Sequence, residues 1–142
     1  MCYRTVKIFL KKKYRMSKIA IIYNPNAGSG KIKKLLQIKE RLSLNNSVTI
    51  FDTQKPGDAT EIARGECGNF DIIVAAGGDG TINEVINGIQ KDTVLGIIPL
   101  GTANILAIEA GIKNDLKSIC KSIEQGITKK IIFQILIIRN FF

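Results

Sequence analysis

The segment VAAGGDGTINEV, from Val74 to Val85, constrains the fold of this chain more than any other part of the sequence. An apolar run over 71–76 stops at Gly77, and apolar residues then recur at helical spacing, at Ile82, Val85, Ile86 and Ile89. This pattern predicts a buried strand, a glycine turn and a helix that begins at the turn. Glycine lets a backbone approach a ligand closely, and a helix N-terminus offers unpaired N–H groups to phosphate. The segment therefore predicts a phosphate-binding turn, although Gly-Gly-Asp-Gly also suits a simple tight turn.

Strand-type and helix-type patterns alternate along the chain from Lys18 onward. Such alternation, with helices of 10–15 residues, is typical of a parallel sheet with helices packed on both faces. We therefore predict an α/β fold of Rossmann-like, three-layer α/β/α architecture. The expected strands are 19–23, 47–53, 71–76, 94–99 and a final one within 127–138. The expected helices are 31–43, one from Gly57-Asp58 onward, 81–90, a short one ending near Gly111, and 115–125.

Two of these helices begin with residues at capping-box spacing. Thr81 and Glu84 fit the pattern at one helix start, and Asp58 and Glu61 stand at N-cap and N3 spacing at another. For Thr81, binding a phosphate through its hydroxyl and backbone N–H is an alternative to capping, and the two roles are compatible. Glu84, with its neighbour Asn83, is similarly expected either to cap the helix or to face a ligand.

Three turn-rich loops follow predicted strands, at 24–30, 77–81 and 101–104. The carboxyl ends of parallel strands share one edge of the sheet, where α/β proteins bind their ligands. We therefore expect the three loops to meet at one site. Asp79, in the middle loop, does not suit direct contact with an anion. Its carboxylate suits a magnesium ion or a hydroxyl nucleophile instead.

Familiar nucleotide motifs are absent. The run Gly28-Ser29-Gly30-Lys31 resembles the end of a P-loop, but Pro25 replaces its first glycine and Ile32 replaces the magnesium-binding Ser or Thr. The dinucleotide pattern G-x-G-x-x-G fails after both Gly-x-Gly pairs, at Lys33 and at Asn83. A standard P-loop or dinucleotide site is therefore excluded.

The net charge of +9 is concentrated at the N-terminus. Residues 1–18 hold seven basic groups and no acid, so the remainder carries only +2. A basic tail of this kind is most often a solvated extension, and in some proteins it contacts an anionic membrane or a nucleic acid. Met16 is an alternative natural start. With a nearly neutral remainder and no aromatic-rich basic face, nucleic-acid binding is the least expected function.

Cysteine and histidine content excludes further classes of site. The three cysteines (Cys2, Cys67 and Cys120) are odd in number and far apart, which indicates neither a disulfide framework nor a zinc site. This usage fits a reducing cytoplasm. The chain has no histidine, so Ser-His-Asp and Cys-His nucleophilic catalysis are excluded. The longest apolar run near the C-terminus, 131–138, is too short to span a bilayer, and the N-terminus has no signal-peptide core.

Three motifs in register resemble the diacylglycerol kinase catalytic domain, and more narrowly the bacterial lipid kinases that include diacylglycerol and sphingosine-type relatives. They are Asn24-Pro25-x-x-Gly28, Gly77-Gly78-Asp79-Gly80-Thr81-x-Asn83-Glu84-Val85-x-Asn87-Gly88, and Pro99-Leu100-Gly101-Thr102-Ala103-Asn104. The resemblance covers about residues 17–130. It implies a Rossmann-like nucleotide-binding domain, and transfer of the ATP γ-phosphoryl group to a lipid hydroxyl with Mg²⁺.

The resemblance also implies roles for individual residues. Residues 77–83 are assigned to the nucleotide phosphates, and Asp79 is the acid at the reaction centre, where it organises magnesium and water or deprotonates the acceptor hydroxyl. The implied nucleotide-binding positions are Asn24, Thr53, Gly77, Gly78, Asp79, Gly80, Thr81, Ile82, Asn83, Glu84 and Thr102. The implied partners are a nucleotide and a lipid acceptor, with a peripheral membrane contact through the basic N-terminus.

Two departures from the family pattern matter. Ile105 stands where the family usually has Asp, directly after Thr-Ala-Asn. Family members also continue into a second, β-rich domain that holds the lipid pocket, whereas residues 131–142 form an atypical apolar tail here. We therefore expect three parts: a basic extension over 1–16, a nucleotide-binding domain over 17–130 and this tail. A truncated, frameshifted or split reading frame explains the tail best, and we expect little or no lipid kinase activity from the chain alone.

Two alternatives to a lipid kinase are considered. NAD kinases share Gly-Gly-Asp-Gly-Thr, but Asn83-Glu84 and the Pro-x-Gly-Thr-x-Asn loop argue against that class. The other alternative is a degenerate nucleotide-binding or regulatory module without catalysis.

Overall fold

The structure, a computed structural model, describes residues 3–6, 16–27, 31–125 and 131–134. Within these residues, four strands form a sheet in the order β3-β2-β4-β5. Every neighbouring pair in this sheet is parallel, which confirms the predicted α/β fold with a parallel sheet. The strands are β2 (Lys18–Tyr23), β3 (Ser47–Asp52), β4 (Ile72–Gly77) and β5 (Val94–Pro99).

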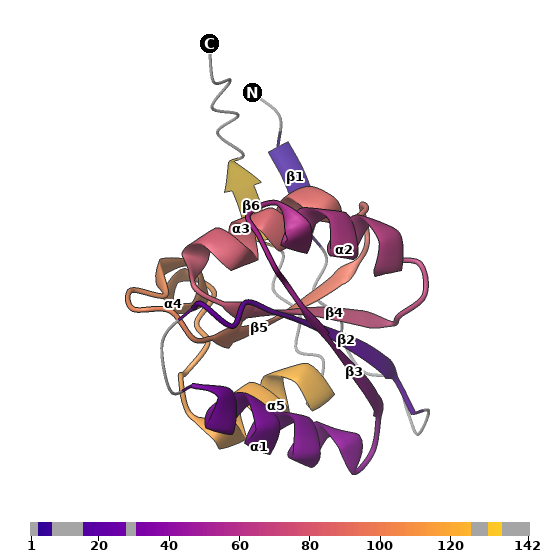
Figure 1. The fold of residues 1–142 in the computed structure, drawn as a ribbon, viewed down its shortest axis with the longest axis vertical. Coiled ribbons are helices and arrows are strands. Elements are labelled where there is room, and N and C mark those ends of the chain that lie inside the picture. The colour runs from indigo at the N-terminus through magenta and orange to yellow at the C-terminus, as the bar shows by residue number, and fades with distance from the viewer. Residues whose placement is uncertain (1–2, 7–15, 28–30, 126–130, 135–142) are drawn as a thin grey trace.

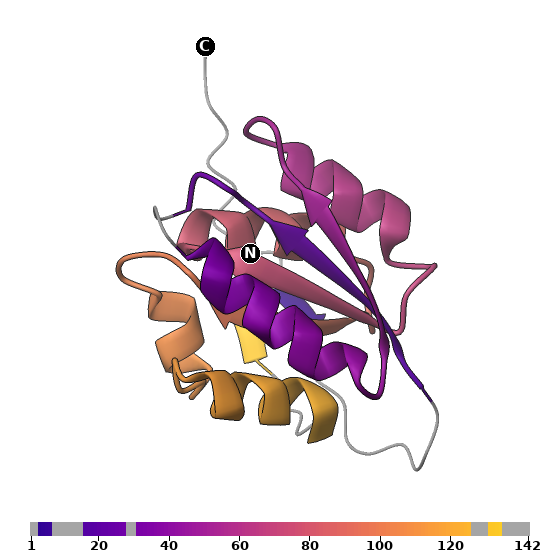
Figure 2. The same ribbon diagram turned by 60° about the horizontal axis from the view of Figure 1, so that its bottom comes forward.

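Helices cover both faces of this sheet, as predicted (Figure 1). One face carries α1 (Ile32–Ser43) and α5 (Leu116–Gln125), and the other carries α2 (Asp58–Glu66) and α3 (Asp79–Gly88). A short helix, α4 (Ile105–Glu109), follows β5. Figure 2 shows α1 and α5 side by side in front of the strands. The layers are therefore helix, sheet and helix.

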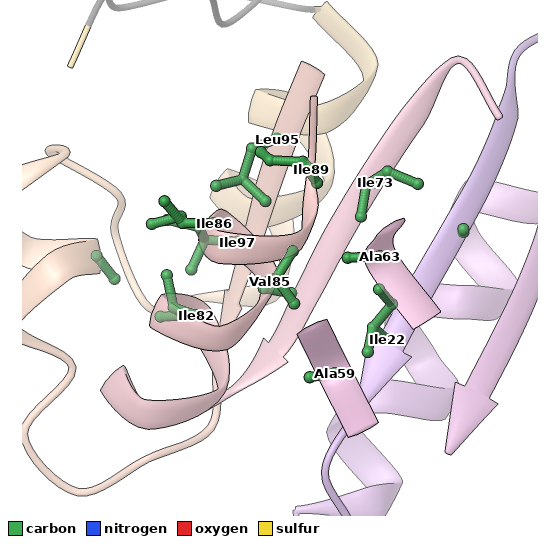
Figure 3. Close-up of a cluster of buried hydrophobic side chains, with 13 residues drawn as sticks. Ile22, Ala59, Ala63, Ile73, Ile82, Val85, Ile86, Ile89, Leu95 and Ile97 are labelled. Atoms are coloured by element: carbon green, nitrogen blue, oxygen red, sulfur yellow. The ribbon is translucent and has the colours of Figure 1, made fainter. Parts of the chain in front are cut away.

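The core consists of two apolar clusters, one on each face of the sheet, because successive side chains of a strand point to opposite faces. In β2, Ile19 and Ile21 join the cluster under α1 and α5, whereas Ala20 and Ile22 join the cluster under α2 and α3. Figure 3 shows the second cluster, in which helix α3 contributes Ile82, Val85 and Ile86. Burying one such Ile or Val side chain contributes about 1.5–3 kcal/mol.

The contact between α2 and α3 is unusually close because of Gly88. A Cβ atom added at Gly88 would lie 2.2 Å from the backbone oxygen of Thr60 and 2.8 Å from the Cβ of Ala63. The hydroxyl of Thr60 also donates a hydrogen bond to the backbone oxygen of Glu84, at 2.9 Å. The glycine therefore sets the distance between the two helices.

Both predicted capping boxes are wrong, and helix α3 begins two residues earlier than predicted. Gly78 is its N-cap, so Thr81 already lies inside the helix and no side chain caps the start. In α2 the N-cap is Gly57, with φ of 90°. The carboxylate of Asp58 accepts hydrogen bonds from the backbone N–H groups of Gln54 and Lys55, which precede the helix. The capping interpretation fails because a glycine in each turn brings the chain into the helix one or more residues early.

Two further strands form a separate two-stranded sheet. Strand β1 (Tyr3–Val6) pairs antiparallel with β6 (Ile131–Gln134). The β1 strand lies in the segment expected to be a basic extension, and β6 lies within the last strand expected over 127–138. Residues 7–15, 126–130 and 135–142 lie outside the described residues. Among the residues that the structure describes, no helix is long and apolar enough to cross a membrane.

Candidate functional site

The chain reverses its direction across the sheet between β2 and β4, because β3 lies on one side of β2 and β4 and β5 lie on the other. Open parallel sheets bind ligands beyond the carboxyl ends of the strands at such a switch point. Backbone hydrogen bonds continue past the strand ends there: Asn24 N–H donates to the Ala76 oxygen at 3.1 Å, and Leu100 N–H to the Gly77 oxygen at 2.9 Å. The loops after β2, β4 and β5 therefore start side by side.

Two glycines are required by close contacts at the turn after β4, one in the turn itself and one in the loop after β5. A Cβ atom at Gly77 would lie 2.5 Å from the Oγ1 atom of Thr81, in the first turn of α3. A Cβ atom at Gly101 would lie 2.5 Å from the Cα atom of Gly78, so the second and third loops touch backbone to backbone. Glycine at these positions leaves the N-terminus of α3 uncovered by side chains.

The start of α3 supplies backbone donors. The first N–H groups of an α-helix have no partner within the helix, and no side chain caps α3. Ile82 N–H donates to the Gly78 oxygen at 3.1 Å, so the unpaired donors precede it, at Asp79, Gly80 and Thr81. Together with the helix dipole, these donors suit an anion.

The Asp79 carboxylate joins the second loop to the third. Its Oδ1 atom accepts a hydrogen bond from Leu106 N–H at 3.0 Å, and its Oδ2 atom accepts one from Ile105 N–H at 3.2 Å. Asp79 therefore caps α4, a helix that starts 26 residues later in the sequence. This role could not be predicted from the sequence, because only the fold brings the two segments together. Ile105 itself is 56% exposed.

The loop from Gly101 to Asn104 is closed by its own last residue. The side chain of Asn104 accepts a hydrogen bond from Gly101 N–H at 2.9 Å and donates one to the Gly101 oxygen at 3.0 Å. Asn104 is 8% exposed and has φ of 52°, in the left-handed region that Asn tolerates better than most residues. Its place at the end of the Pro-Leu-Gly-Thr-Ala-Asn motif is the sequence signal for this role.

Lys31 joins the start of α1 to the third loop. Its Nζ atom donates hydrogen bonds to the backbone oxygens of Leu100 at 2.7 Å and Gly101 at 2.9 Å. These carbonyls lie where β5 ends, so the ammonium group fixes the direction in which the loop leaves the sheet. From the sequence, Lys31 was considered as part of a failed P-loop and as the first residue of the predicted helix 31–43, and its position next to Gly28-Ser29-Gly30 was the available signal for this role.

Asn24 and Thr81 meet across the switch point. The Nδ2 atom of Asn24 lies 3.3 Å from the Oγ1 atom of Thr81, which is 6% exposed. The Oδ1 atom of Asn24 accepts a hydrogen bond from Asn26 N–H at 2.9 Å and shapes the first loop. Gly28 and the rest of 28–30 lie outside the described residues.

Glu84 and Thr53 lie on the β3 side of the site. The Oε1 atom of Glu84 accepts a hydrogen bond from Gly57 N–H at 3.1 Å, so this side chain holds the loop before α2. Thr53, at the carboxyl end of β3, is 7% exposed, and its N–H donates to the Tyr23 oxygen at 2.9 Å. Glu84 thus serves the neighbouring loop, and it does not cap its own helix.

The remaining predicted positions divide by exposure. Gly80, Asn83 and Thr102 are exposed at or near the edge. Ile82 is fully buried in the apolar cluster under α2 and α3, so its side chain faces away from the loops. The structure thus brings most of the predicted positions to one edge of the sheet, and their contacts with a nucleotide stay a prediction.

The family described as "Diacylglycerol kinase catalytic domain" matches residues 18–134. A diacylglycerol kinase of Staphylococcus aureus (strain bovine RF122 / ET3-1) is 40% identical over 119 residues, which are 78% of this chain and 37% of the relative. The diacylglycerol kinase of Staphylococcus saprophyticus is 43% identical over 114 residues, 75% of this chain and 37% of the relative.

A solved structure with a similar fold carries the same description as these sequence relatives. The crystal structure of a diacylglycerol kinase from Bacillus anthracis superimposes with a TM-score of 0.69 and 32% identity, over 79% of this chain and 40% of that one. The chain spans about 37% of the length of the curated relatives that it matches.

Proposed function

Because this chain belongs to the diacylglycerol kinase catalytic domain family, we propose that it is the ATP-binding part of a lipid kinase. The kinase transfers the γ-phosphoryl group of ATP to the hydroxyl of a diacylglycerol-like lipid. The observation that carries the proposal is the uncapped N-terminus of α3, which opens onto the edge where the loops after β2, β4 and β5 meet.

In this proposal the ATP phosphates lie against the glycine turn. The N–H groups of Asp79, Gly80 and Thr81 donate to phosphate oxygens, and glycine at 77 and 78 keeps side chains out of the way. Thr102 approaches from the exposed third loop. Asn24, Thr53 and Glu84 hold the surrounding loops, so their contribution is to the shape of the site.

The chemical step is an in-line displacement at the γ-phosphorus. The lipid hydroxyl oxygen forms the new bond to phosphorus, the bond from phosphorus to the β,γ-bridging oxygen breaks, and ADP leaves. Asp79 is the proposed acceptor of the hydroxyl proton. Each of its carboxylate oxygens accepts one N–H, from Ile105 or Leu106, and retains a second lone pair. Such reactions need positioning and charge neutralisation more than covalent work by the protein.

Magnesium enters this proposal only as the companion of ATP. Within the described part of the chain, no three Cys, His, Asp or Glu side chains come together as a metal centre. The described residues therefore form no metal centre with three such ligands, and no step is assigned to the ion. Magnesium bound mainly by phosphate and water, with one or two carboxylates, is common in ATP-dependent enzymes.

ATP binding and phosphoryl transfer are tested in separate experiments. Equilibrium dialysis with radiolabelled ATP measures binding, and we expect competition by ADP and none by NAD. Transfer of γ-labelled phosphate to diacylglycerol or to NAD is then measured with the same protein. We expect ATP binding with little or no transfer to either acceptor.

Two outcomes count against the proposal, and a third counts only against the expected weak activity. Absence of saturable ATP binding contradicts the assignment of the site. Faster transfer to NAD than to lipid assigns the chain to a different kinase class. Measurable phosphorylation of diacylglycerol contradicts the expected weak activity while supporting the lipid acceptor.

A peripheral membrane contact through the basic residues of 1–16 also belongs to the proposal. Deletion of residues 1–15 should then weaken binding to lipid vesicles.

A further inference from the structure

The N-terminal strand β1 lies outside the residues that match the family. The match covers 18–134, so it includes β6 and excludes β1. In the structure β1 nevertheless lies beside β6 and pairs with it antiparallel over the whole length of both strands (Figure 1). A segment outside the family match therefore covers the last strand within it.

Strand β6 begins the part of the sequence that is best suited to strand pairing between copies. Residues 131–138 read Ile-Ile-Phe-Gln-Ile-Leu-Ile-Ile, with no charged residue, glycine or proline. Short segments of high β-propensity and low charge, without proline, form intermolecular sheets when their edges are free. Charged residues commonly flank such segments, and here Lys129 and Lys130 precede this one and Arg139 follows it. The edges of β6 therefore need protection.

A strand has two edges, and pairing at one of them limits what can follow. Within residues 3–6, 16–27, 31–125 and 131–134, β6 has β1 as its neighbour and no second one. A strand with one paired edge accepts one further strand, so association through it ends at a closed pair of copies. A strand with two open edges adds strands on both sides, and its assembly is open-ended.

The outer edge of β1 is poorly suited to further pairing. Strand β1 contains Arg4, and it belongs to residues 1–18, which hold seven basic groups and no acid. Charged side chains protect the edge strands of natural sheets, and like charges on two copies repel each other. The small sheet therefore ends at β1 in a charged segment, whereas β6 carries no charge.

We propose that β1 is a built-in edge strand, which covers β6 within one chain and prevents open-ended association of copies through β6. Because β1 belongs to the same chain, it competes for β6 at an effective concentration on the order of millimolar, well above that of a second copy in dilute solution. The inference does not depend on ATP binding, because the loops after β2, β4 and β5 belong to the other sheet.

Disulfide cross-linking tests the pairing in solution. Arg4 and Phe133 are direct partners in the register, and partners in an antiparallel pair have Cα atoms about 4.5–5.5 Å apart, which a disulfide can span. The variant Arg4→Cys/Phe133→Cys, in a Cys2→Ser background, is oxidised and its disulfide is located by mass spectrometry. Arg4→Cys/Ile131→Cys is the matched control, because Ile131 pairs with Val6 instead. We expect an intrachain disulfide in the first variant and several-fold less of it in the control.

Size-exclusion chromatography with light scattering tests the consequence of the pairing. The variant Thr5→Pro/Val6→Pro removes two adjacent backbone donors, and one of them faces β6 because successive N–H groups point to opposite edges of a strand. Thr5→Val/Val6→Thr is the matched control, which keeps both donors and both β-branched side chains. The wild type and the control should elute as a monomer or a closed pair across a dilution series. The proline variant should form large assemblies as its concentration rises.

A further substitution shows whether β6 is the strand that associates. Adding Ile132→Lys to the proline variant places a charge within β6 and should restore the size of the wild type. Adding Leu36→Lys instead places the same charge at a half-exposed apolar position of α1 and should not restore it. This pair of variants distinguishes exposure of β6 from general misfolding of the proline variant.

The inference is overturned if the disulfide of Arg4→Cys/Phe133→Cys joins two copies, or if it forms no more readily than in the control. It is also overturned if the proline variant keeps the size of the wild type, if the wild-type chain itself forms open-ended assemblies, or if Ile132→Lys fails to restore the proline variant. ATP binding of the cross-linked protein should equal that of the wild type, so failure of this inference and failure of the proposed function are distinguishable.

Discussion

At the scale of single residues, Asp79 has a structural role that its place in the motif does not reveal. Gly-Gly-Asp-Gly predicts a carboxylate at a phosphate-binding turn, and the structure shows that this carboxylate accepts N–H groups from the start of α4. The proposed proton acceptor is thus held in place by the loop that is proposed to contact the nucleotide. Loss of the carboxylate should change both the reaction and the shape of the site.

Replacement of Asp79 by Ala should destabilise the protein by about 1–2 kcal/mol, because two backbone donors of α4 lose their cap. Urea unfolding measures this change, and amide hydrogen exchange at Leu106 should become faster. Asn83→Ala is the matched control in the same turn, because Asn83 is exposed, and a surface change of this kind is expected to stay within about 0.5 kcal/mol. Equal stability of the two variants would show that the cap contributes nothing.

Lys31 is the second residue whose role depends on contacts distant in sequence. Replacement by Met removes the two hydrogen bonds to Leu100 and Gly101. Since the side chain is only half-buried, we expect a loss of about 1 kcal/mol in stability, together with a several-fold loss in ATP affinity as the third loop loosens. Lys39→Met, also on α1, should leave ATP affinity unchanged. The assignment fails if both variants bind ATP as the wild type does.

At the scale of elements, the sequence predicts the sheet well and the helix starts less well. The four parallel strands lie within one residue of their predicted ends, because continuous apolar runs such as 71–76 are buried on both faces of a parallel sheet. Helix α2 starts at the predicted Gly57-Asp58 and α3 starts two residues before the prediction, but in both the cap was wrong, because capping-box spacing pointed to Asp58 and Thr81. Gly57 and Gly78 take that place, and the acidic side chains bind other loops.

The candidate site could also be predicted from the sequence only in part. That three loops would meet at one edge could be predicted, since parallel strands end together. The bonds from Asp79 to α4 and from Lys31 to Leu100 could not be predicted, because they join segments 26 to 69 residues apart and depend on the actual path of each loop.

The contact between α2 and α3 allows a prediction at the element scale. Gly88→Ala should destabilise the protein by about 1–3 kcal/mol, because the added Cβ overlaps the backbone oxygen of Thr60 and the helices must move apart. Gly65→Ala in α2 is the matched control. A Cβ there meets nothing within 4 Å, so the change should stabilise by about 0.5–1 kcal/mol through backbone entropy. Thermal or urea unfolding of both variants measures the difference, and a stabilising Gly88→Ala would refute the close contact.

At the scale of the whole molecule, a charge-separated α/β/α domain presents its loops at one edge. One helical layer is basic and the other acidic, and the edge between them carries the uncapped start of α3. The chain shares with diacylglycerol kinases the part that contains this edge. The family match covers residues 18–134, and the chain spans about 37% of the length of the relatives.

The central claim, that this edge binds ATP at the glycine turn, is tested most directly by titrating the ¹⁵N-labelled protein with ATP and following backbone amide resonances. We predict saturable chemical-shift changes that are largest at residues 77–81 and at Thr102. The variant Gly101→Ala should abolish these changes, because the added Cβ atom would overlap the backbone of Gly78. Gly65→Ala should retain them. The absence of saturable shifts, or shifts centred away from the loops after β2, β4 and β5, would contradict the account.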